Sequence, residues 1–96
     1  MKKAILMNKD DNVATVLKSV KKGGMIAVIS TDNKVVKNIE ARKEIAAGHK
    51  IAVNLIGEGE IVVKYGESIG TAIDRIDQGT HVHIHNVRSK VKYDGS

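Results

Sequence analysis

The hydrophobic positions along the chain form short runs bounded by turn residues, a pattern that is typical of short β-strands. Strands are expected over residues 3–7, 25–30, 50–55 and 61–64. Residues 34–42 fit either a helix or a strand, and their β-branched side chains favour the strand. The chain is therefore predicted to be mainly β.

Two segments are expected to be helical. In the first, four apolar residues recur at the spacing of one helix face. They are Val13, Val16, Leu17 and Val20. Residues 10–12 offer side chains that can cap the start of this helix, and Gly23-Gly24 would end it. A shorter helical turn is predicted over residues 71–76.

An aliphatic residue, two variable positions and a glycine recur four times, each time shortly before a predicted strand. The four copies are Val20 to Gly23, Ile45 to Gly48, Ile56 to Gly59 and Ile76 to Gly79. The pattern indicates a tight turn in which glycine takes a backbone conformation closed to bulkier residues, while the aliphatic side chain anchors the turn in the core. Short strands joined by such turns predict a compact, twisted, barrel-like β unit.

A chain of 96 residues predicts a single domain over residues 1–96 with a modest core. The expected fold is mainly β with one or two short helices. Residues 89–96 are expected to form a short edge strand or a frayed tail.

Three of the four histidines fall in one short segment. It consists of His81, Val82, His83, Ile84, His85 and Asn86. Strict alternation predicts a strand, within residues 81–87, whose two aliphatic residues face the core and whose histidines share the other face.

On such a strand, residues two apart lie about 7 Å from each other and residues four apart about 13 Å. The histidines could then bind a metal ion as one pair at a time, His81 with His83 or His83 with His85. A further ligand would come from His49, Glu58 or Glu60, from the substrate, or from another chain. The alternative is a solvated face, or a contact between subunits. The spacing of His49 itself indicates only a surface histidine.

Lys64-Tyr65-Gly66 is the second candidate for chemistry. The lysine could bind a carboxylate, the phenol could donate a hydrogen bond or a proton, and the glycine would let a ligand approach the backbone. The alternative is a β-bulge with a solvated lysine and a tyrosine in the core.

Composition excludes several classes of protein. The chain has no cysteine, which excludes disulfides, thiolate metal sites and a cysteine nucleophile, and fits a cytoplasmic location. The N-terminal apolar run is too short for a secretory signal, and no run could span a membrane. The net charge of +5 permits an anionic ligand, but the basic residues are scattered and not interleaved with aromatic ones, so nucleic acid is not expected as a partner.

Three ordered blocks of the chain, residues 48–52, 63–72 and 76–87, resemble the N-terminal segment of the altronate dehydratase and galactarate dehydratase family. In that family the segment is a SAF domain with a β-clip fold, fused to a large catalytic domain or present as a separate small subunit. The chain is also similar to the small subunit of sulfolactate sulfo-lyase.

The resemblance implies the small subunit of a hydro-lyase that removes water from a 2,3-dihydroxy sugar acid, with a divalent metal, iron or manganese. It would act only with a large dehydratase subunit. Substrate contacts are expected at Lys64, Tyr65, Gly66, His85 and Asn86, with Lys64 and Tyr65 as the catalytic candidates. The alternatives are a non-catalytic SAF module that binds a carbohydrate or a protein, and the small subunit of a sulfolactate sulfo-lyase. Self-association into a homo-oligomer is also left open.

Overall fold

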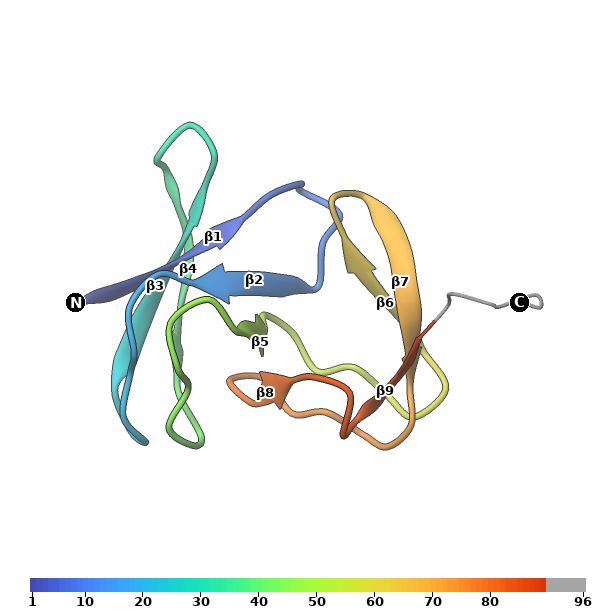
Figure 1. The fold of residues 1–96 in the computed structure, drawn as a ribbon. Coiled ribbons are helices and arrows are strands. Elements are labelled where there is room, and N and C mark those ends of the chain that lie inside the picture. Colours follow the sequence, from blue (N-terminus) through green and yellow to red (C-terminus); the bar gives the residue numbers. More distant parts are fainter. Residues whose placement is uncertain (90–96) are drawn as a thin grey trace.

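The computed structural model describes residues 1–89, which form nine strands and no helix (Figure 1). The strands are β1 (Lys2–Leu6), β2 (Val13–Val16), β3 (Met25–Ser30), β4 (Val35–Glu40), β5 (Lys50–Ala52), β6 (Ile61–Lys64), β7 (Glu67–Ala72), β8 (His81–Val82) and β9 (Val87–Ser89). Within that range there is accordingly no helix that is long and apolar enough to cross a membrane. The mainly-β prediction is confirmed, and the one or two short helices are wrong.

The strands form a six-stranded sheet and a three-stranded sheet. The larger sheet has the order β4-β3-β1-β2-β5-β8, and the smaller has the order β6-β7-β9. Strands β1 and β3 are parallel, whereas the other neighbouring pairs are antiparallel. In Figure 1, β5 and β8 lie below β2, and the smaller sheet lies to their right.

Two hydrophobic cores share the strands β2 and β5. On β2, Val13 belongs to the smaller core and Ala14 to the larger. On β5, Ala52 belongs to the smaller core and Ile51 to the larger. Because successive side chains of a strand point to opposite faces, both faces of these two strands are covered by apolar side chains. Such strands show no alternation of hydrophobic and polar residues.

The helix predicted over residues 13–20 is wrong for this reason. Residues Val13–Val16 are β2, and Val20 pairs with Ile45 in an isolated bridge. Leu17, which completed the helical stripe, is 46% exposed. Pairing of β2 with β1 and β5 satisfies its backbone groups, and this tertiary pairing overrides the local spacing.

The helical turn predicted over residues 71–76 is also wrong. Thr71 and Ala72 are the last residues of β7. Ile76 pairs with Ile56 across an isolated antiparallel bridge, with both of its backbone hydrogen bonds formed. Residues 71–76 therefore form the end of β7 and the bridge of Ile76 to Ile56, and no helical turn.

Four expected strands are confirmed to within two residues at each end. They are β1, β3, β4 and β6. The expected strand over residues 50–55 is shorter, because β5 ends at Ala52 and the next amide, that of Val53, bonds to the carbonyl of Asn12. Ser89 is the last residue of β9, in agreement with the edge strand that was one alternative for residues 89–96. The rest of that prediction lies outside the described residues. The assignment to one domain stays a prediction.

All four aliphatic-x-x-glycine segments form turns, as predicted. Their glycines have φ between +84° and +87°, and their aliphatic residues are at most 2% exposed. The turns pack in two pairs, in which Val20 bridges to Ile45 and Ile56 to Ile76. Each turn leads within two residues into a strand, so these pairs fix where β3, β5, β6 and β8 begin.

Two of these glycines provide a matched test of the turns. Gly59→Ala should lower the free energy of unfolding by about 1–2 kcal/mol, since φ is +84° and nothing lies within 4 Å of the added Cβ. Gly79→Ala should lower it by clearly more, because φ is +86° and the added Cβ would clash with the backbone carbonyl oxygen of Glu40. Urea denaturation of both variants measures the difference, and equal losses would contradict this account of the turn.

Candidate functional site

The histidine segment is a turn for most of its length, not a strand. Only His81 and Val82 are in β8, and the chain folds back before β9. Val82 is fully buried, as expected, but Ile84 is 79% exposed, so the prediction that Ile84 faces the core is wrong. The predicted alternation of one histidine face and one core face therefore ends at Val82.

Asn86 closes this turn. Its side-chain amide donates to the carbonyl oxygen of His81 at 2.8 Å, and its side-chain oxygen accepts from the amide of His83 at 2.9 Å. Its own amide donates to the carbonyl oxygen of His83 at 3.0 Å. Asn86 is 8% exposed, so these bonds are largely shielded from water. The polar atoms of Asn86 proposed for a substrate are thus engaged in shaping the histidine turn.

The turn gathers the three histidine rings more closely than a strand would. The rings of His81 and His83 are stacked with centroids 5.5 Å apart, and those of His81 and His85 are 5.3 Å apart. The predicted separation of His81 from His85 is therefore wrong. Because the chain turns after Val82, the ring of His85 lies close to that of His81, whereas an extended strand would have separated them.

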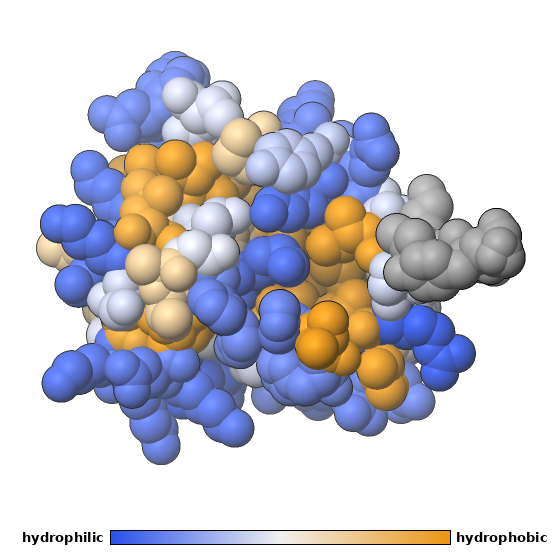
Figure 2. All heavy atoms as spheres, viewed as in Figure 1, coloured by the Kyte–Doolittle hydropathy of each residue, from blue (hydrophilic) through white to orange (hydrophobic). Residues whose placement is uncertain are grey.

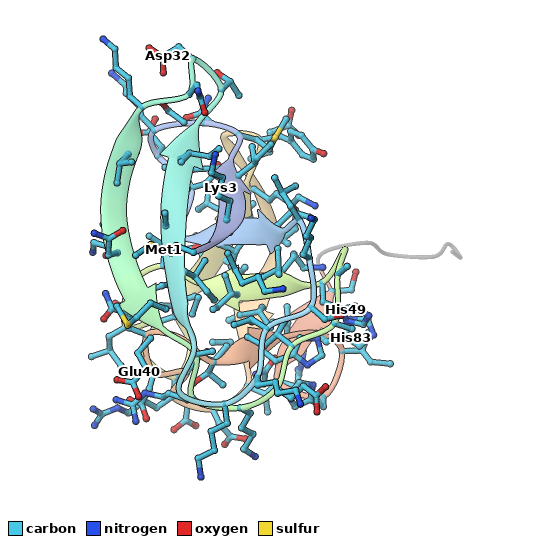
Figure 3. The ribbon with its side chains drawn as sticks, turned by 90° about the vertical axis from the view of Figure 1, so that its left-hand side faces the viewer. Met1, Lys3, Asp32, Glu40, His49 and His83 are labelled. Atoms are coloured by element: carbon cyan, nitrogen blue, oxygen red, sulfur yellow. The ribbon has the colours of Figure 1, made fainter. Side chains whose placement is uncertain are left out.

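His49 completes the cluster from a neighbouring segment. It precedes β5, which pairs antiparallel with β8, and its Nδ1 lies 2.9 Å from Nε2 of His81. Its ring centroid is 5.6 Å from that of His83, and Figure 3 shows the two side chains side by side at one margin of the molecule. The expectation of an ordinary surface histidine at position 49 is wrong, since His49 is half-buried within the cluster.

Three of these histidines are arranged to share one metal ion. One ring nitrogen from each of His49, His81 and His83 lies within 4.8 Å of the others. No carboxylate belongs to this group within residues 1–89. Neutral imidazole nitrogens are ligands that iron, zinc, copper and nickel accept, whereas manganese is better matched by oxygen ligands. The donor set fits a divalent transition metal, and it consists of one pair from the histidine segment, His81 with His83, and His49 as the further ligand.

Two neighbouring lysines add positive charge to the site. Lys50 and His83 both line a cavity of about 190 Å³ beside the histidine turn. Burial, and then the charge of Lys64, lowers the pKa of the Lys50 ammonium below its usual range. Burial also lowers the pKa of His81, followed by the charges of His49, His85, His83 and Lys50. Lys50 is half-buried beside the cavity and forms no ion pair with a carboxylate within residues 1–89, so the site favours an anionic ligand.

The Lys64-Tyr65-Gly66 segment is the tip of the β6–β7 hairpin. Tyr65 and Gly66 have φ of +58° and +75°, as in a two-residue turn of type I′. The buried carboxylate of Asp11 accepts hydrogen bonds from the amides of Tyr65 and Gly66 at 2.9 and 2.8 Å. The prediction that Asp11 caps a helix is therefore wrong.

Tyr65 is 59% exposed, so the alternative that placed it in the core is wrong. The Nζ of Lys64 stands 5.0 Å from the centroid of its ring. The charge of Lys64 acts on Lys50, whereas the ring of Tyr65 lies on the surface of the hairpin tip.

Sequence reasoning named His49 only as one of several possible further ligands, and it missed Lys50 as a cation beside the cavity. The available signal was their position directly after the glycine of a turn, where a strand begins next to β8. It also missed that Asn86 organises the turn, although an asparagine that ends such a segment is a common turn residue.

Comparison with known proteins agrees with this architecture. A family model of the altronate/galactarate dehydratase SAF domain matches residues 2–90. The chain belongs to this family. The SAF domain is 36% identical over 91 residues to an altronate dehydratase of Bacillus subtilis, with 95% of the chain and 17% of that protein covered. It is 41% identical over 81 residues to an altronate dehydratase of Escherichia coli, with 84% and 15% covered.

A third relative has the size of the SAF domain itself. The subunit alpha of a (2R)-sulfolactate sulfo-lyase from Chromohalobacter salexigens is 36% identical over 87 residues, covering 90% of the chain and 93% of that subunit. The chain thus spans less than a fifth of the altronate dehydratases it matches, but nearly all of a lyase subunit.

The lowered pKa of His81 predicts a pH-dependent stability of the metal-free SAF domain. The unfolded chain takes up this proton near the ordinary pKa of 6.5, and the folded chain takes it up only at lower pH. The unfolded state therefore binds more protons below that pKa, and the free energy of unfolding falls as the pH drops through that range. At pH values above the ordinary pKa, the contribution of His81 to the free energy of unfolding is constant.

Urea denaturation at several pH values, with a chelator present, measures this dependence. His81→Gln should show a smaller loss of stability toward acid than the wild type. The same loss in both proteins would show that His81 titrates no differently in the fold.

Proposed function

We propose that this SAF domain acts in the cytoplasm as the small subunit of a sugar-acid dehydratase of the altronate or galactarate type. It would contribute one wall of an active site that a separate large catalytic chain completes. The observation that carries the proposal is the convergence of His49, His81 and His83 beside the Lys50 cavity. The altronate dehydratases that the chain resembles contain this domain as a small part of a longer protein.

The reaction has parts that match the groups in the site. A proton is removed from the carbon next to the carboxylate, the β-hydroxyl leaves as water, and the enol product becomes a 2-keto-3-deoxy acid. Negative charge builds on the carboxylate as the proton leaves. Lys50 in the wall of the cavity, with Lys64 close enough to lower its pKa, is placed to bind that carboxylate and stabilise the charge.

The histidines are placed to hold the divalent metal. The lowered pKa of His81 keeps its ring neutral over a wider pH range, which is the form that binds metal. The all-imidazole set favours iron over manganese among the two metals considered. When bound, the metal would act as a Lewis acid toward substrate oxygen atoms. Asn86 would hold the histidine turn in shape, since its side chain bonds to the backbone on both sides of Val82.

His85 and the hairpin tip have secondary roles in this proposal. His85 is exposed and near His81, which suits a substrate contact at the edge of the cluster. Tyr65 is exposed beside the ammonium of Lys64. Its phenol would transfer a proton only in a complex in which the large chain covers the hairpin tip. Gly66 would serve the turn, because its amide already bonds to Asp11.

A second candidate is the small subunit of a sulfolactate sulfo-lyase, and one observation favours it. The chain covers 93% of such a subunit, so the two match in length as well as in sequence. The chemistry begins in the same way, with loss of the proton next to the carboxylate, but a carbon–sulfur bond then breaks and sulfite leaves. The proposed roles of Lys50 and the histidines are the same for both acids.

Reconstitution with the large catalytic chain from the same organism tests the proposal. Altronate and galactarate are assayed for a 2-keto-3-deoxy product, and (2R)-sulfolactate for released sulfite. We expect turnover of one class of acid by the mixture and none by the SAF domain alone. His83→Ala should lower kcat of the complex by about 100-fold or more, as loss of a metal-site residue does. Leu55→Ala, at an exposed position outside the cavity, should leave kcat near that of the wild type.

Two outcomes would contradict the proposal. One is an assembled complex that releases neither water nor sulfite, which would indicate a non-catalytic binding module. The other is full activity of the His83→Ala complex, which would remove the histidine cluster from the reaction.

A further inference from the structure

A second surface of the SAF domain has the features of a docking site. A groove of about 1050 Å³ lies among the start of β1, the segment that follows β2 and the start of β3. Its apolar part includes Leu17, Val20 and Met25. Leu17 and Met25 are 46% and 44% exposed, although each is large enough to be buried in a core. Figure 2 shows hydrophobic surface between hydrophilic side chains at the end of the molecule that carries the start of β1.

The groove is strongly biased toward positive charge. From the part of the chain that the structure describes, four lysines line it, Lys2, Lys3, Lys18 and Lys21, against one carboxylate, that of Glu44. All five side chains are exposed, and neither of the two ion pairs within residues 1–89 involves a groove residue. Like charges around an apolar surface repel one another and are stabilised by an anionic partner.

We propose that this groove docks an apolar segment, flanked by Asp or Glu residues, on the large catalytic chain. An apolar side chain would cover Leu17 and Met25, and the flanking carboxylates would pair with the lysines. A second copy of the SAF domain is a poorer occupant, because a two-fold contact through this surface would place one lysine rim against another. Among the described residues, 1–89, no aromatic side chain on which nucleic-acid bases could stack lines the groove.

The groove is connected to the histidine cluster through β2. The amide of Val16 donates to the carbonyl oxygen of His49 at 2.9 Å, and Gly48 donates to Val16 at 2.7 Å. The next residue, Leu17, belongs to the groove and donates to the carbonyl oxygen of Lys3 at 3.0 Å. Figure 3 faces the end with Met1 and Lys3, and His49 and His83 lie at the margin of that view. One large chain could therefore fill the groove and also close the site at the histidines.

This inference rests on the proposed function for the identity of the partner, but its readout is affinity and not turnover. The dissociation constant of the SAF domain for the large chain is measured by isothermal titration calorimetry. Leu17→Asp and Met25→Asp should each weaken binding by about tenfold or more, as expected for apolar contacts near the centre of an interface. Leu55→Asp is the matched control, since Leu55 is 53% exposed and lies outside the groove.

The charged rim is tested separately. The double variant Lys18→Glu/Lys21→Glu should weaken binding by about tenfold or more, and binding by the wild type should weaken as salt is raised. Lys9→Glu/Lys34→Glu makes the same change of charge outside the groove and should leave the affinity near that of the wild type. Urea denaturation of each variant checks that the fold is retained.

Affinities that are equal for the groove variants and the wild type would overturn the inference, as would equal losses in the matched controls. Self-association of the wild type that the groove variants abolish, with no change in affinity for the large chain, would also overturn it and assign the groove to a homo-oligomer. Groove-dependent binding without turnover of any acid would support the docking site while contradicting the proposed function, so the two failures are distinguishable.

Discussion

The structure depends on four turns in which a glycine takes a left-handed backbone conformation and an aliphatic residue three positions earlier is buried. The aliphatic residues pair across the molecule, Val20 with Ile45 and Ile56 with Ile76, so that each turn is held by another. The turn at Gly48 is followed directly by His49, and the turn at Gly79 is followed by Thr80 and His81. The same constraint that starts strands β5 and β8 therefore delivers two histidines to one place.

These turns also show what local sequence could predict. A glycine that must adopt φ near +85° leaves a strong signal, because other residues rarely take this conformation, and an aliphatic anchor at a fixed distance adds to it. The turns and most strands were predictable for that reason. The segment over Val13–Val20 was not, because β2 is covered by apolar side chains on both faces and its spacing imitates a helix. Its conformation is decided by pairing with β1 and β5, and β5 is distant in sequence.

The candidate site was predictable in part. The histidine segment was recognisable because it holds three of the four histidines of the chain. Val82 faces the core, as the alternation predicted. The turn that follows depends on three hydrogen bonds of Asn86, and a regular alternation of residue types gives no sign of them. His49 could not be assigned from spacing, since it joins the cluster through the antiparallel pairing of β5 with β8 across a long stretch of chain.

The proposed function rests on the residues of the domain and on the proteins to which it is similar. Its own residues provide imidazoles, ammonium groups and a small cavity, which suit a metal ion and an anionic acid. The family places such a domain in altronate dehydratases many times its length and in a sulfo-lyase as a subunit of its own size. A wall of a shared site is consistent with both arrangements, because a small domain can contribute ligands and charge while a larger chain surrounds the substrate.

The most direct test of the central claim is the position of the metal in the assembled complex. X-ray diffraction from crystals of the complex, recorded on both sides of the iron absorption edge, locates iron by its anomalous signal. The account predicts one iron within bonding distance of ring nitrogens of His49, His81 and His83. An iron bound only by residues of the large chain, with these three histidines away from it, would contradict the account.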